Sequence, residues 1–149
     1  MDIIASKSKS KFSIFQAKRI EAIEEYFTSY SKAEQMWWHI SVLGIFKNQI
    51  DAKEMDEMIF PSLNEVKSNA LRLRLFLKND EMTTIDVITE RLFTINQTLS
   101  DLYFDDERGL SASVKSGNFH IKREAELEKN EKDIAEITVK LRASYGLSQ

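Results

Sequence analysis

The feature that most constrains this chain is its shortage of the residues that make tight turns. Its 149 residues include 1 proline, 4 glycines and no cysteine. Sandwiches, barrels and doubly wound sheets need many more tight turns than so few prolines and glycines supply. Because 42% of the residues are hydrophobic, the chain can still bury one compact core. We therefore expect an all-α fold, a four- to five-helix bundle with a long C-terminal helix, formed by residues 12–149 as a single domain.

The spacing of apolar residues predicts two helices in the first third of the chain. Apolar side chains recur three or four positions apart, which indicates a helix that begins at residue 12 or 14 and ends at residue 30. Ser31 followed by Glu34 matches a capping box, so a second helix over residues 32–48 is expected to follow at once. The stripe of the first helix consists of Ile20, Ile23, Phe27 and Tyr30.

The single proline, Pro61, is predicted to begin a third helix. Proline is tolerated in the first turn of a helix, so we expect one charged helical turn or two over residues 51–60 and then a helix over residues 61–78. The alternation of leucine and arginine over residues 71–75 would also fit a strand, but the heptad seam in the same segment favours a helix. That seam consists of Leu63, Val66, Ala70, Leu73 and Leu77.

The second half of the chain predicts two further helices and one long loop. Thr83 or Thr84 is expected to cap a helix whose apolar residues repeat without interruption to residue 102. Residues 105–118 lose this periodicity and predict a loop, and residues 119–145 predict the long C-terminal helix, ended by Gly146. The charged half of that helix, residues 122–133, is expected to stand in solvent or to project from the body. The uninterrupted stripe consists of Ile85, Ile88, Leu92, Ile95, Leu99 and Leu102.

Residues 1–11 are predicted to form a flexible basic arm. Lysines alternate with serines there, and such a sequence has little to bury. Residues 1–19 hold five basic residues and one acidic residue, although the whole chain has a formal charge of -3. Weak nucleic-acid binding through Lys7, Lys9 and Lys11 is therefore one alternative function, but the overall charge does not favour it.

The function that the sequence favours is protein binding. Adjacent tryptophans on a helix point about 100 degrees apart, so Trp37 and Trp38 cannot both face one interior seam. At least one of them is expected at an exposed edge, and tryptophan is enriched in binding hot spots. We therefore expect a non-enzymatic adaptor, regulator or immunity-type inhibitor that binds a protein partner or a second copy of itself through an aromatic and acidic helical surface. The candidate contact residues are Trp37, Trp38, Phe46, Arg72, Arg74, Glu124 and Glu128.

A metal-dependent enzyme is the competing hypothesis. The acids Glu21, Glu24 and Glu25, followed by Asp51 and Glu54, loosely resemble the paired carboxylates of all-helical nucleotide pyrophosphohydrolases, although Glu54 stands where their pattern has aspartate. That resemblance would imply a divalent metal bound between helices. Such spacing also arises in any acidic helical protein, and the chain has no glycine-rich phosphate loop and no nucleophile motif. We therefore predict no catalytic residue, metal or cofactor.

The sequence also favours the cytoplasm. The chain lacks cysteine, which fits a reducing compartment, and its first residues lack the charge pattern of a signal peptide. The most apolar window, residues 36–46, is shorter than the ~20 residues that a membrane span needs. We expect no membrane-spanning segment.

Overall fold

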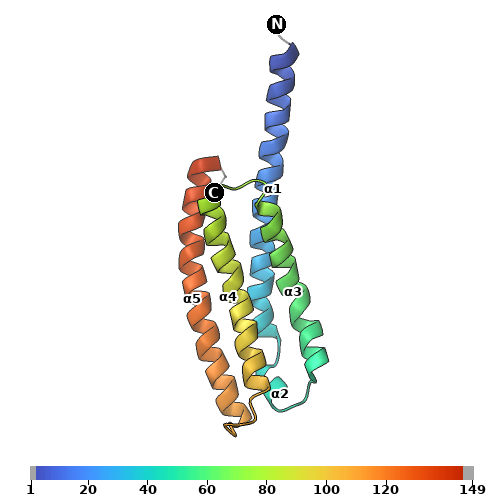
Figure 1. The fold of residues 1–149 in the computed structure, drawn as a ribbon, viewed down its shortest axis with the longest axis vertical. Coiled ribbons are helices and arrows are strands. Elements are labelled where there is room, and N and C mark those ends of the chain that lie inside the picture. The colour runs from blue at the N-terminus through green and yellow to red at the C-terminus, as the bar shows by residue number, and fades with distance from the viewer. Residues whose placement is uncertain (1–2, 146–149) are drawn as a thin grey trace.

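The protein is an all-α bundle with a long C-terminal helix, as the sequence predicted. The structure, a computed structural model, describes the backbone of residues 3–145 and the side chains of residues 13–145. Within that range the chain forms no strand. Four long helices lie side by side, and a short helix closes one end of the bundle (Figure 1). The helices are α1 (Ile3–His39), α2 (Val42–Phe46), α3 (Ala52–Leu73), α4 (Asn79–Tyr103) and α5 (Ala112–Tyr145).

The first helix has no break at Ser31, so the predicted boundary there is wrong. α1 is continuous from Ile3 to His39 because its buried stripe continues through the boundary without a change of spacing. The predicted helix over residues 32–48 is instead divided at Ser41, whose hydroxyl accepts the Gly44 N–H at 3.1 Å and caps α2. The buried residues of the α1 stripe are Ile23, Tyr26, Tyr30, Ala33 and Trp37.

The start of α1 also differs from the prediction. The backbone is helical from Ile3, so it includes most of residues 1–11, which the sequence predicted to be a flexible arm. Serine and lysine are permissive in helices, and no glycine or proline interrupts this stretch. The first part of α1 extends well beyond the ends of the other long helices (Figure 1). Residues 1 and 2 lie outside the described residues.

The third helix begins before Pro61. The Asp51 carboxylate accepts the Glu54 N–H at 2.8 Å and caps α3. Pro61 lies inside α3, on its exposed face. An interior proline costs a helix roughly 3 kcal/mol, and burial of the apolar stripe on the opposite face of α3 offsets this cost. The stripe crosses the proline position and confirms the predicted seam; its residues are Met55, Ile59, Leu63, Val66, Ala70 and Leu73.

The connection between α3 and α4 lies earlier in the chain than predicted. α3 ends at Leu73, and α4 begins at Asn79, so Asn79 opens a helix although it was predicted to end one. The cause is Glu81, whose carboxylate accepts the Lys78 backbone N–H at 2.9 Å. Thr83, the predicted cap, lies inside α4 and donates from its hydroxyl to the Asn79 carbonyl at 2.9 Å.

The last helix is longer and better buried than predicted. α5 begins at Ala112, where the Ser111 hydroxyl accepts the Val114 N–H at 3.2 Å, so only residues 104–111 form the preceding loop. Gly117 is accommodated within the helix, and the predicted cap Gly146 lies outside the described residues. Arg123, Glu126 and Asn130 are buried, so the expectation that residues 122–133 stand in solvent is wrong.

The core is formed by the apolar stripes of the four long helices. α1 packs mainly against α3, and α5 mainly against α4. The predicted α4 stripe is buried along its whole length. At the end where α1 leaves the bundle, the Tyr145 hydroxyl donates to Glu81 Oε1 at 2.6 Å and ties α5 to α4. Over residues 3–145 no helix has both the length and the apolar composition needed to cross a membrane.

A groove between α1 and α5 as the candidate functional site

The two predicted binding tryptophans have opposite environments. Trp37 is buried, with its ring centroid 5.9 Å from that of Phe119, whereas 57% of Trp38 is exposed. The prediction that at least one of them lies at an edge is confirmed. Phe46 is buried in the core at the end of α2. Of the three predicted aromatic residues, only Trp38 presents a surface to a partner.

An arginine that the sequence analysis missed organises the surroundings of Trp38. The guanidinium of Arg123 lies over the Trp38 ring, 4.2 Å from the centroid, and donates to the Trp37 carbonyl at 3.4 Å. Only 5% of Arg123 is exposed, and this burial lowers the pKa of its guanidinium. The signal available in the sequence was Phe119, one turn earlier on the same helix, which shows that this face of α5 points inward.

The remaining predicted contact residues lie on separate surfaces. Arg72 pairs with Glu25 of α1, and the Arg74 guanidinium lies 2.6 Å from the Asp86 carboxylate of α4. Glu124 is exposed on α5 and lies 3.5 Å from Arg123, while Glu128 is exposed one turn further along. The structure therefore places Glu124 near Trp38 but does not join these residues into one site.

The acids of the enzyme hypothesis are also separated. Glu25 lies beside the last third of α3, where Asn69 donates to its backbone carbonyl at 3.3 Å. Asp51 and Glu54 stand at the first turn of the same helix, about 20 Å away by helical rise. Among the side chains of residues 13–145, no three acidic or histidine side chains form a group that could hold a metal ion. The side chains of Lys7, Lys9 and Lys11 lie outside the described residues.

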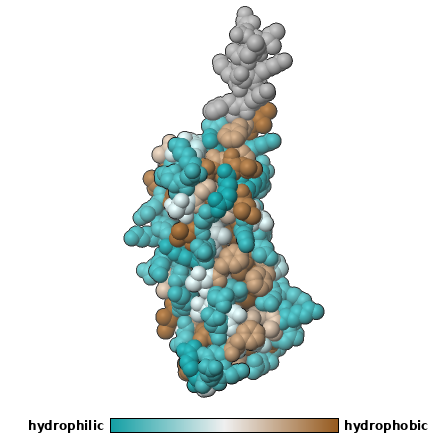
Figure 2. All heavy atoms as spheres, in the orientation of Figure 1, coloured by the Kyte–Doolittle hydropathy of each residue, from teal (hydrophilic) through white to brown (hydrophobic). Residues whose placement is uncertain are grey.

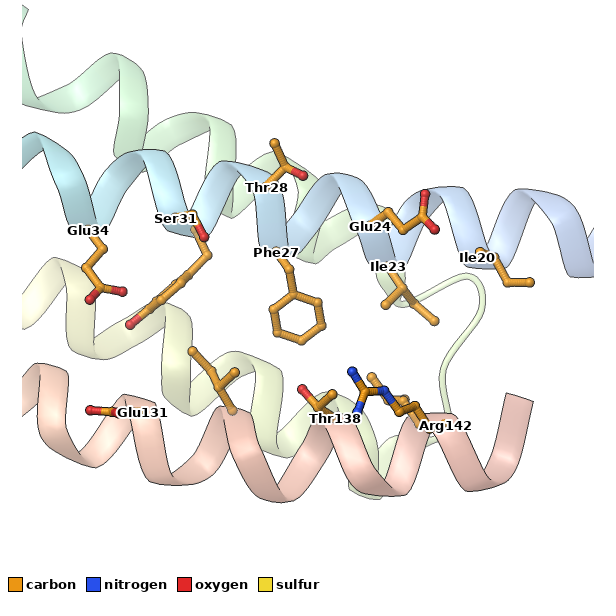
Figure 3. A pocket seen from close by; sticks show the side chains of 13 residues that line it. Ile20, Ile23, Glu24, Phe27, Thr28, Ser31, Glu34, Glu131, Thr138 and Arg142 are labelled. Carbon is orange, nitrogen blue, oxygen red and sulfur yellow. The ribbon is translucent and has the colours of Figure 1, made fainter. Parts of the chain in front are cut away.

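A groove runs between α1 and α5. Its volume is about 960 Å³. Phe27 points from α1 into the space between the two helices (Figure 3), and Ile134 of α5 also lines the groove. The groove exists because α1 leans toward α3 and α5 toward α4, which leaves the seam between them partly open. Its apolar lining residues are Ile20, Ile23, Phe27, Tyr30, Ile134 and Leu141.

The charges around this groove are unequal at its two ends. Glu34 of α1 and Glu131 of α5 stand together at one end, whereas Arg142 stands near the other, where Glu24 also lines the groove (Figure 3). Burial raises the pKa of Glu34, and the nearby carboxylates of Glu131 and Glu124 raise it further. Three acids against one base make the rim of the groove acidic.

Tyr30 forms part of the wall beside these acids. Burial raises the pKa of its phenol to about 12, and the negative charge of Glu34 acts in the same direction. The hydroxyl therefore stays protonated at neutral pH, so it can donate a hydrogen bond. The groove thus combines an apolar floor with acidic and hydroxyl groups.

Sequence reasoning identified the apolar residues of this groove but assigned them to the core. Ile20, Ile23, Phe27 and Tyr30 were predicted as one buried face. Ile23 and Tyr30 are buried in the core as predicted, whereas Ile20 and Phe27 are only partly buried. The signal was present in the adjacent aromatics Tyr26 and Phe27, which must point in different directions on a helix.

Comparison with known proteins adds no further assignment. The chain matches no protein family model, no curated protein and no solved structure.

Proposed function

We propose that this protein is a non-enzymatic interaction module whose α1–α5 groove binds a helical segment with an apolar face and basic flanking residues. The observation that carries the proposal is the groove itself, about 960 Å³ of open, largely apolar space between two long helices. An amphipathic helix buries its apolar face in such a groove, and this is a recurring mode of peptide recognition.

Apolar contact would supply most of the affinity. Phe27 and Ile20 are partly exposed along the groove, and Ile134 faces them from α5. Covering apolar surface is favourable by roughly 25 cal/mol per Å² before the costs of association. A binding segment would place two or three apolar side chains between Phe27 and Ile134.

Charge would select the partner. Glu24, Glu34 and Glu131 line the groove, and only Arg142 opposes them. Burial and the charge of Glu131 both raise the pKa of Glu34. A lysine or arginine placed beside Glu34 would offset the repulsion between these two carboxylates. Complementary charge of this kind raises the association rate and excludes acidic partners.

The exposed Trp38 supports a secondary contact area near Glu124. The guanidinium of Arg123 lies over the indole of Trp38 and holds it in place, while much of the side chain stays exposed to a partner. A module with these surfaces can serve as an adaptor, a regulator or an inhibitor of a protein partner. Since the chain lacks cysteine, we propose that it acts in the reducing environment of the cytoplasm.

Calorimetry with two synthetic helical peptides tests the proposal. The peptides, each about five helical turns long, share one leucine and phenylalanine face and carry either lysine or glutamate on both flanks. We expect the lysine peptide to bind with a dissociation constant in the micromolar range, about -8 kcal/mol, and the glutamate peptide to bind at least about tenfold more weakly.

Matched variants locate the binding site. Glu34→Lys should weaken binding of the lysine peptide about tenfold, whereas Glu57→Lys, the same change on the exposed face of α3, should leave it unchanged. Phe27→Ala should weaken both peptides, with the exposed Phe104→Ala as its control. Failure of the lysine peptide to bind the wild-type protein would overturn the proposal, as would equal effects of Glu34→Lys and Glu57→Lys.

A further inference from the structure

We infer that the groove is filled by the first part of α1 from a second copy of this chain, so that two chains form a twofold dimer with antiparallel α1 helices. The inference rests on the proposed function, because it names the helical segment that the groove takes. It follows from the projection of α1, the continuity of its groove face and the charge of its first residues.

α1 extends past the end of the bundle. Phe15 still packs against Phe76 of the α3–α4 connection, with ring centroids 5.3 Å apart, so this contact marks the level at which the bundle ends. The helix upstream of Phe15 continues for about 20 Å beyond that level (Figure 1). Helices of this length are marginal on their own in water, so packing against a second chain would stabilise the segment.

The face of α1 that lines the groove continues into this projecting part. With 3.6 residues per turn, positions 9, 12 and 16 fall on the same side of the helix as Ile20, Phe27 and Glu34. A second α1 laid antiparallel against this face therefore meets the groove of the first chain with its own projecting part. The arrangement is reciprocal, as a twofold interface requires.

A twofold axis near Ile20 fixes the register. Position 12 of one chain then lies level with position 28 of the other, and position 9 lies level with position 31. The sequence has Phe12 and Lys9 at these positions. This register places position 12, a phenylalanine, beside Phe27, and position 9, a lysine, within one turn of Glu34. An apolar residue thus meets the apolar part of the groove, and a basic residue meets its acidic end.

Charge and exposed apolar surface agree with this arrangement. Residues 1–19 carry five basic residues and one acidic residue, whereas the groove carries three acids and one base. Ile14 is 55% exposed and Leu75 is 74% exposed at the end of the bundle from which α1 projects, where apolar side chains gather below the grey segment in Figure 2. The axis near Ile20 brings this end of one chain next to that of the other.

The absence of native cysteine allows a direct test with single cysteines. Ile20→Cys places two thiols together at the proposed axis, where mild oxidation or a short bismaleimide should link most of the protein into dimers. Glu57→Cys, exposed on α3 away from the groove, should not cross-link. Light scattering of the wild-type protein should give twice the chain mass of 17.3 kDa.

Charge reversal tests the register. Lys9→Glu and Glu34→Lys should each raise the dissociation constant of the dimer about tenfold, and the double variant should recover most of the loss. Excess lysine peptide should compete for the groove and release monomers. A wild-type monomer at high concentration that still binds the lysine peptide would overturn the dimer and leave the proposed function standing. A dimer that fails to cross-link through Ile20→Cys, or that does not respond to Glu34→Lys, would overturn the inferred occupant of the groove.

Discussion

Tyr26 and Phe27 are consecutive residues of α1 with opposite surroundings. Tyr26 is fully buried between α1 and α4, and its hydroxyl lies 2.8 Å from that of Thr89. Phe27 packs edge-on against Tyr26, with ring centroids 5.2 Å apart, but it faces the open groove toward α5. One helix therefore has a closed side, toward α3 and α4, and an open side, toward α5.

The two sides of α1 differ in whether their polar side chains have hydrogen-bond partners within the protein. On the closed side polar side chains have specific partners, as when Asn69 donates to the Ser29 hydroxyl at 3.1 Å. On the open side the carboxylates of Glu24 and Glu34 line a groove that reaches solvent. The closed side is thus organised for stability, whereas the open side leaves apolar and charged groups available to a partner. Substitutions on each side test this division, beginning with the largest effect.

Leu92→Ala should cause the largest loss of stability. Leu92 is fully buried in α4 at the centre of the closed side, so its truncation removes apolar contacts and leaves a cavity. We expect the free energy of unfolding to fall by about 2–5 kcal/mol. Urea denaturation followed by tryptophan fluorescence measures the loss. Ile134→Ala, on the open side, is the comparison and should cost clearly less; equal losses would contradict the division.

Asn130→Ala should have the next largest effect. Asn130 is fully buried, donates to the Ile88 carbonyl at 3.1 Å and accepts from the Arg91 guanidinium at 3.1 Å, so it joins α5 to α4. Its removal leaves these partners without their hydrogen bonds and should lower the free energy of unfolding by about 1–3 kcal/mol. Thermal denaturation checks the result. Glu128→Ala, on the exposed face of α5, is the control and should leave the stability nearly unchanged.

The closed side was the more predictable of the two from sequence. The α4 stripe from Ile85 to Leu102 and the seam from Leu63 to Leu77 are buried as expected, because each is an uninterrupted three-four repeat. Helix ends were less predictable because local signals competed with packing. Ser31 and Glu34 match a capping box, yet the buried stripe of α1 runs through them and keeps the helix intact.

A paired substitution at Tyr26 and Phe27 separates the two sides directly. Tyr26→Phe removes the hydrogen bond to Thr89 and should lower the free energy of unfolding by about 1 kcal/mol without changing peptide binding. Phe27→Ala should lower stability by a similar amount, about 1 kcal/mol, because the ring is only partly buried. Only Phe27→Ala should weaken binding of the lysine peptide, by about tenfold or more. Parallel calorimetry distinguishes the variants, and equal effects on binding would contradict the separate roles.

The groove itself could not be predicted from the sequence because it results from how pairs of helices lean. Periodicity shows that Phe27 and Ile134 are apolar positions of amphipathic helices, but not that their seam stays partly open. Arg123 was missed for a related reason. It lies within a run of charged residues, which masked the signal from Phe119 one turn earlier, and the fold shows that this turn of α5 packs on the aromatic end of α1.

The smallest effect expected is a change in the pH dependence of stability at Glu34. Burial, together with the charges of Glu131 and Glu124, raises the pKa of Glu34 above its ordinary value of 4.5 in the folded protein. The folded state therefore holds this proton more tightly than the unfolded chain does. Stability must then decline as the pH rises from about 4.5 through the folded-state pKa, because ionisation is less costly in the unfolded chain.

Glu34→Gln should remove this decline. Its free energy of unfolding should approach that of the wild type near about pH 4 and exceed it increasingly toward about pH 7. Urea titrations at dilute, monomeric protein measure the difference, and Glu57→Gln controls for the change in net charge. Curves for Glu34→Gln and wild type that stay parallel over this range would contradict the prediction. Peptide binding should show the opposite trend with pH. Only ionised Glu34 attracts the lysine peptide, so the affinity of the protein for this peptide should rise over the pH range in which its stability falls.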